Sequence, residues 1–99
     1  SLKPTLAINS NLKQAAAYPG SLQNLLDLQP SIRRIGSAAL TLAYVAAGRF
    51  DAALLSDLAS WDIVPGQLLI TEAGGQFTSE KVSDKIVDTW RVSAQAKNQ

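Results

Sequence analysis

The sequence predicts an α/β domain in which helices pack on a mixed sheet of about five strands. Three observations favour this fold. Short apolar segments that suit buried strands alternate along the chain with longer segments of helical period. Gly, Pro or helix-capping residues stand between most of these segments. The composition, with 46% hydrophobic and 17% charged residues among 99, is that of one globular domain with a modest core, residues 1–99.

The first third of the chain predicts two strands with a helix between them. Residues 6–8 read as a short buried strand. Residues 31–35 read as a second strand, although two adjacent arginines interrupt its alternation. Between the strands, residues 21–28 carry a stripe of leucines behind a capping serine, so we expect a helix that Pro30 ends.

The middle of the chain predicts an alanine-rich helix followed by a strand. Residues 38–47 are apolar on nearly every side, which is typical of a buried helix, and the alanines allow close packing against a sheet. Ser37 is expected to be the N-cap of this helix and Gly48 its C′ residue. Residues 50–55 are expected to form a third strand, and residues 57–60 a connecting loop.

The segment WDIVPGQLLITEAGG, residues 61–75, predicts a helix with a signal at each end. Pro65 has no N–H, and only first-turn N–H groups lack helical partners, so we expect Asp62 to be the N-cap and Pro65 the N3 residue. The two glycines at the end of the segment should stop the helix. Two strands around a polar loop are expected to follow it: residues 76–79 and 86–92, with the loop at 80–85.

The residue types exclude several classes of site. Without Cys or His, the chain cannot hold a disulfide, a zinc finger or a Ser-His triad of its own. Its nine basic residues are scattered and the net charge is +1, which argues against nucleic acid as the primary partner. We expect no membrane contact and a cytoplasmic protein, because no apolar run approaches the ~20 residues of a membrane span and no signal peptide is present. The chain has no initiating Met, so we expect a fragment.

Two expected helix starts follow strand ends, where ligands of open α/β sheets bind. At the first, Gly36 would let a ligand approach the backbone or would simply fit a tight turn. At the second, Asp62 would only cap the helix or would hold a hard cation such as Mg²⁺. The other acidic residues are spread out, so co-ligands of Asp62 would come from elsewhere. Trp61 is more typical of a packing anchor, and at most one of Arg33 and Arg34 can face the site.

The run from Arg33 to Gly75 resembles the C-terminal half of the inositol monophosphatase family. The motifs that carry the resemblance are RRIGSAAL leading to VAAGRFD, and WDIVPGQLLITEAGG, in that order and spacing. The resemblance implies a magnesium-dependent phosphomonoesterase that hydrolyses a small phosphorylated metabolite, such as an inositol, sugar or nucleotide phosphate. It implies Asp62 as a ligand of Mg²⁺ and a segment that lines the substrate pocket, formed by Gly36, Ser37 and Ala38.

The principal metal motif of the family, D-P-x-D-G followed by Ser or Thr, has no match in the chain. We therefore expect a C-terminal domain whose partner is the N-terminal half of the same protein, and which is inactive alone. Leu55 stands where inositol-specific members carry a substrate-binding Glu, which argues against inositol. The alternative is a non-catalytic binding or regulatory module that acts through protein–protein contacts, and a homodimer is compatible with either. The metal motif upstream of Ser1 would favour the enzyme.

Overall fold

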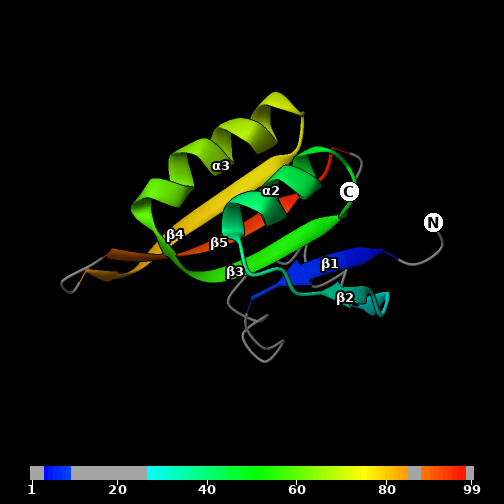
Figure 1. Ribbon diagram of the computed structural model, residues 1–99, viewed down its shortest axis with the longest axis horizontal. Helices are drawn as coiled ribbons and strands as arrows, with labels where there is room; N and C mark the ends of the chain where they lie inside the picture. Colours follow the sequence, from blue (N-terminus) through cyan, green and yellow to red (C-terminus); the bar gives the residue numbers. More distant parts are fainter. Residues whose placement is uncertain (1–3, 10–26, 85–87, 98–99) are drawn as a thin grey trace.

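The computed structural model describes residues 4–9, 27–84 and 88–97, and these residues form a five-stranded mixed sheet (Figure 1). The strand order is β2-β1-β3-β5-β4. The first three strands in the sequence are parallel, and the last two complete the sheet in antiparallel pairs. The predicted mixed sheet is confirmed. The strands are β1 (Thr5–Ile8), β2 (Ser31–Arg33), β3 (Ala52–Ala59), β4 (Gln76–Asp84) and β5 (Asp88–Gln95).

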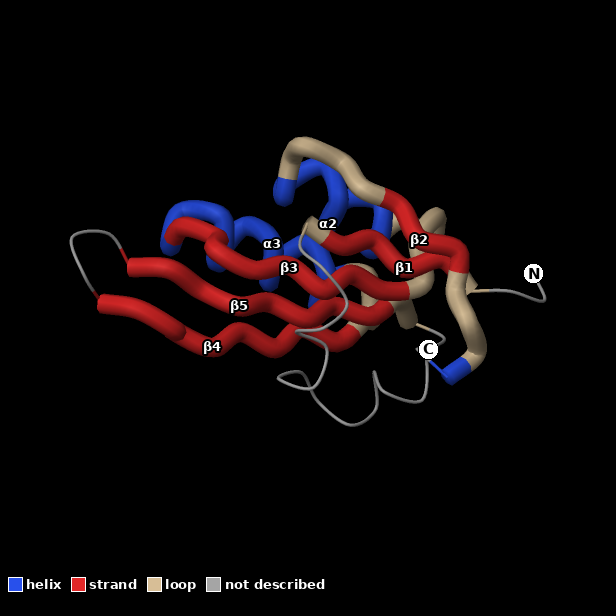
Figure 2. Tube along the Cα trace, turned by 90° about the horizontal axis from the view of Figure 1, so that it is seen from below, coloured by secondary structure: helices blue, strands red, loops and turns tan. Residues whose placement is uncertain are grey.

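Helices α2 (Ala38–Ala46) and α3 (Ser60–Glu72) lie side by side on one face of the sheet, as Figures 1 and 2 show. The main core lies between this helical layer and the sheet. This core contains apolar residues of both layers: Leu42, Val45, Ile63 and Ile70 from the helices, and Ala53, Leu55 and Val92 from the central strands. A second, smaller cluster comes from alternate residues of β1 and β3 on the opposite face: Leu6, Ile8, Ala52 and Leu54.

The capping residues predicted for α2 are confirmed. The Ser37 Oγ accepts a hydrogen bond from the Leu40 amide at 3.1 Å, and Gly48 follows the helix at a φ of +77°. The expectation of a helix buried on nearly every side is wrong, because among the described elements α2 packs on the sheet and on α3. Its buried residues therefore form one stripe, Thr41, Leu42 and Val45, and Leu40 remains 44% exposed. The helix expected over residues 21–28 lies almost entirely outside the described residues.

Helix α3 begins earlier than the position of its proline indicates. Ala59 is its N-cap and makes no side-chain capping bond, so the prediction of Asp62 as N-cap is wrong. Asp62 lies instead within the first turn, and Pro65 lies inside the helix. The hydrogen bond that Pro65 cannot donate would have gone to the carbonyl of Trp61, four residues earlier. Since Trp61 lies at an exposed helix start, water can replace that bond.

The C-terminus of α3 ends in a Schellman arrangement at the two predicted glycines. The amide of Gly75 donates to the Ile70 carbonyl at 2.9 Å, and the amide of Gly74 donates to the Thr71 carbonyl at 3.0 Å. Gly74 has a φ of +84°, which a residue with a Cβ rarely adopts. The prediction that these glycines stop the helix is confirmed.

Strands β3 and β4 are longer than expected, whereas β2 ends at Arg33 instead of residue 35 and β5 begins and ends later than the predicted 86–92. The loop predicted at residues 57–60 is wrong, because β3 continues to Ala59 through an irregularity between Leu55 and Leu58. The loop predicted at 80–85 is also wrong, because β4 continues to Asp84 and pairs with β5 along most of its length. As β4 is the edge strand, its polar residues can face water without breaking the pairing. No helix in the described part of the chain is long and apolar enough to cross a membrane.

Candidate functional site

A cavity of about 420 Å³ opens where the parallel strands end. The last residue of β1, Ile8, and the following Asn9 lie on it, and the loop that leaves β2 contributes Arg34 to Gly36. The rest of the lining comes from the first residue of α2 and from β3: Ala38, Leu55 and Leu58. The cavity therefore occupies the place, beyond the carboxyl ends of parallel strands and at a helix start, where α/β sheets bind ligands.

The start of α2 brings backbone rather than side-chain groups to the cavity. A Cβ on Gly36 would meet no atom within 4 Å, so the backbone is open to an approaching ligand here. The Ser37 Oγ is held by the Leu40 amide, and Ser37 is not part of the lining. The amides of Ala38 and Ala39, in the first turn, have no intrahelical acceptor and lie at the positive end of the helix dipole. Of the three predicted pocket residues, Gly36 and Ala38 line the cavity.

Asn9 clamps β3 at the edge of the cavity. Its Oδ1 accepts a hydrogen bond from the Ser56 amide at 2.8 Å, and its Nδ2 donates to the Ser56 carbonyl at 2.7 Å. The last backbone pair between β1 and β3 joins Ile8 to Leu54, so the Asn9 side chain continues the pairing that the backbone ends. Sequence reasoning missed this role, because an Asn after a strand is the ordinary sign of a loop.

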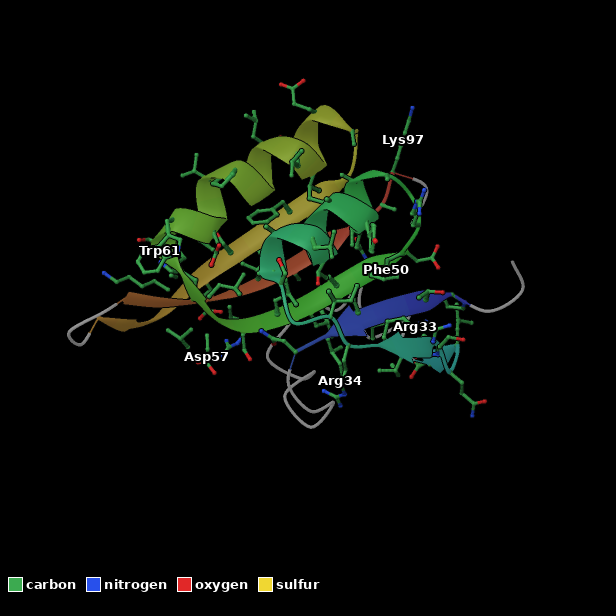
Figure 3. All side chains as sticks on the ribbon, viewed as in Figure 1. Arg33, Arg34, Phe50, Asp57, Trp61 and Lys97 are labelled. Atoms are coloured by element: carbon green, nitrogen blue, oxygen red, sulfur yellow. The ribbon has the colours of Figure 1, made fainter. Side chains whose placement is uncertain are left out.

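The irregularity in β3 is a bulge that keeps two leucines on one face. Asp57 adopts a φ of +58°, a conformation that Asp tolerates better than most residues. Residues three apart on a regular strand face opposite sides, but Leu55 and Leu58 both join the main core. In Figure 3, Asp57 lies below the bend where β3 passes into α3. The bulge thus gives the cavity two neighbouring aliphatic side chains.

The two adjacent arginines have different surroundings. Arg34 lines the cavity. Arg33 is exposed at the end of β2, and its Nη1 donates to the carbonyl of Ile32 at 3.0 Å. The prediction for this pair assumed that both arginines alternate across one strand, but β2 ends at Arg33 and Arg34 lies in the loop that follows it.

Asp62 is half-buried in the first turn of α3 and is not part of the cavity lining. Its neighbour Trp61 is 71% exposed at the start of the helix (Figure 3), so the prediction that Trp61 is a packing anchor is wrong. Within the described residues, no group of three or more acidic side chains is placed to hold a metal ion. Mg²⁺ accepts one or two carboxylates together with phosphate and water oxygens. The role of Asp62 as a ligand of Mg²⁺ therefore stays a prediction, in which the other donors would come from outside these residues.

Comparison with known proteins identifies the family of the chain. Residues 5–99 match the model of the inositol monophosphatase family. The chain belongs to this family. It is 50% identical over 68 residues to the inositol-1-monophosphatase of Rhizobium meliloti (strain 1021), an alignment that covers 69% of the chain and 26% of that protein. It is also 48% identical over 77 residues to the Nus factor SuhB of Pseudomonas aeruginosa, which covers 78% of the chain and 28% of that protein.

Solved structures of the family have the same fold. The extragenic suppressor protein SuhB of Bartonella henselae superposes on 97% of the chain with a TM-score of 0.67 and 32% identity. The inositol monophosphatase of Anabaena (Nostoc) sp. PCC 7120 superposes on 97% of the chain with a TM-score of 0.63 and 33% identity. The chain covers 38% and 40% of these two structures. It spans about a quarter of the length of the curated relatives that it matches.

Proposed function

We propose that this chain forms one wall of the active site of a magnesium-dependent phosphomonoesterase that hydrolyses a small phosphorylated metabolite. The observation that carries the proposal is the cavity beyond β1, β2 and β3, which meets the open backbone at Gly36 and the start of α2. A helix start with free amides favours a phosphate group. The relative from Rhizobium meliloti, an inositol-1-monophosphatase, supports the same reaction class.

The residues of the chain have separate roles in this proposal. The Ala38 amide and the Arg34 guanidinium bind the phosphate, and Gly36 leaves room for its close approach. Asp62 would hold Mg²⁺ together with ligands from the N-terminal half of the parent protein. When bound, such an ion neutralises charge on the phosphate and lowers the pKa of its water. Because no group of three or more acidic side chains in the described residues is placed to hold a metal ion, the 99 residues alone are expected to release no phosphate.

A chimera tests the proposal. The matching segment of the Rhizobium meliloti inositol-1-monophosphatase is replaced by that of this chain, which is 50% identical over 68 residues. We expect magnesium-dependent phosphate release that Asp62→Asn abolishes without lowering the melting temperature. Glu72→Gln makes the same change of carboxylate to amide at the exposed far end of α3 and should leave the rate unchanged. Full activity of the Asp62→Asn chimera, or magnesium-dependent activity of the 99 residues alone, would refute the proposal.

A non-catalytic regulatory module is the second candidate, and the exposed face of α3 favours it. Trp61, Val64 and Leu68 are 71%, 70% and 58% exposed and follow the spacing of one helix face. Such a patch on a soluble domain is suited to a protein contact. The Pseudomonas aeruginosa relative is a Nus factor, a name that denotes no hydrolase. A chimera that folds, keeps the metal motif of the relative and has no activity would favour this candidate over the enzyme.

A further inference from the structure

The floor of the cavity is part of the main core. Leu55 and Leu58 belong to this core and are only 2% and 5% exposed, and Ala38 packs against the same cluster. Ile35, in the loop after β2, adds a further aliphatic side chain to the lining. A ligand that reaches the floor of the cavity therefore meets aliphatic side chains there, with Asn9 and Arg34 elsewhere in the lining.

The polar groups of the lining suit an anion better than a set of hydroxyl groups. The Asn9 amide already bonds Ser56 through both its oxygen and its nitrogen, which leaves one of its N–H groups for a ligand. Arg34 brings positive charge, and the start of α2 brings backbone N–H groups. These N–H donors match the oxygens of a phosphate. A hydroxyl group of the ligand that lies beside Leu55 and Leu58 would instead lose its hydrogen bonds to water without gaining a partner.

We propose that the cavity selects phosphate monoesters whose alcohol portion carries few hydroxyl groups. The phosphate lies at Arg34 and the start of α2, and the alcohol portion lies against Leu55 and Leu58. This inference rests on the proposed phosphatase function and adds the substrate class to it. A polyol such as inositol would bury hydroxyl groups against aliphatic side chains, whereas an apolar ring gains from the same contact.

Cyclohexyl phosphate and inositol monophosphate are a matched pair of probes, because they share a ring and a phosphate and differ only in the ring hydroxyls. Each is titrated into the 99-residue chain, with inorganic phosphate as the reference for the anion alone. The backbone amide resonances of Gly36 and Ala38 report binding in the cavity. Cyclohexyl phosphate is expected to bind with a Kd at least about tenfold lower than that of inositol monophosphate.

A pair of variants locates the preference. Leu55→Gln places an amide group on the cavity floor and is expected to reduce the ratio of the two Kd values several-fold. Leu54→Gln is the control, because Leu54 is also buried, at 3% exposed, but belongs to the cluster on the opposite face of the sheet. That variant should keep the ratio of the wild-type chain. If neither variant folds, the ratio measured on the wild-type chain decides alone.

The outcomes separate the inference from the function on which it rests. Equal affinities, or tighter binding of inositol monophosphate, overturn the inference and leave the phosphatase proposal standing. If neither ester nor inorganic phosphate moves the Gly36 and Ala38 resonances, both the inference and the proposed role of this cavity are overturned.

Discussion

Replacing Gly75 by alanine is expected to destabilise the domain, because Gly75 is where the end of α3 touches the sheet. A Cβ at this position would collide with the backbone carbonyl oxygen of Gln95, and it would lie 3.0 Å from the Cγ2 of the fully buried Ile70. Gln95 cannot move aside easily, because it pairs with Ala52 on one side and Gln76 on the other. The helix end would therefore have to lift from β5.

The size of the effect follows from two opposing terms. Overpacking at a fixed backbone costs about 1–3 kcal/mol. Alanine also reduces the conformational entropy of the unfolded chain, which stabilises the folded state by about 0.4–1 kcal/mol where the native conformation allows it. We expect Gly75→Ala to lower the free energy of unfolding by about 1–2 kcal/mol, the first term less the second. With a urea slope of about 1–3 kcal/mol per molar, the unfolding midpoint should fall by about 1 M.

Urea unfolding followed by circular dichroism measures this change, and Gly36→Ala is the matched control. The control makes the same substitution at a glycine whose added Cβ would meet nothing within 4 Å, so its free energy of unfolding should change by less than about 1 kcal/mol. If the two variants unfold at the same urea concentration, the close approach of α3 to β5 does not constrain the fold and the reasoning is wrong.

Three further variants test other contacts through their unfolding free energies. Ser37→Ala removes the side-chain cap of α2 and should cost about 1 kcal/mol, whereas Ser37→Asp should keep most of it. Asn9→Ala removes the clamp on Ser56 and should cost about 1–2 kcal/mol, with faster hydrogen exchange at the Ser56 amide; unchanged exchange would contradict the clamp. Glu80→Gln should cost less than about 1 kcal/mol, because Glu80 is 62% exposed in its 3.2 Å ion pair with Arg91, and a larger loss would show that the pair is shielded from water.

The features that sequence reasoning predicted correctly are those with local causes. A serine before an apolar helix can supply its own cap, and Ser37 does so with an amide three residues away. A glycine after a helix can adopt positive φ at low cost, and Gly48 and Gly74 both do. The place of the cavity also agrees with the sequence, because a helix start was expected after the second strand and Gly36 and Ala38 line the cavity there.

The features that were missed depend on contacts between distant residues. Asn9 bonds Ser56 across 47 positions of the chain, and no local pattern reveals such a pair. Without that clamp, the run from Asp57 to Ser60 has the polarity of a loop, which is why it was predicted as one. The start of α3 was misplaced for another reason: the prediction relied on a capping side chain, whereas the N-cap, Ala59, makes no side-chain capping bond.

The bulge in β3 connects the substrate side of the proposed site to its metal side. A shift of one residue along a strand moves a side chain to the other face, and a shift of one residue along a helix rotates it by about 100°. Since β3 passes into α3 without a loop, the bulge at Asp57 sets both the face on which Leu58 lies and the direction of Asp62. Asn9, which directly follows β1, bonds Ser56 at the start of that bulge, so one amide side chain supports the position of Leu58 and the start of α3 that carries Asp62. The residue types of the proposed site are visible in the sequence, but the direction in which Leu58 and Asp62 point depends on tertiary contacts.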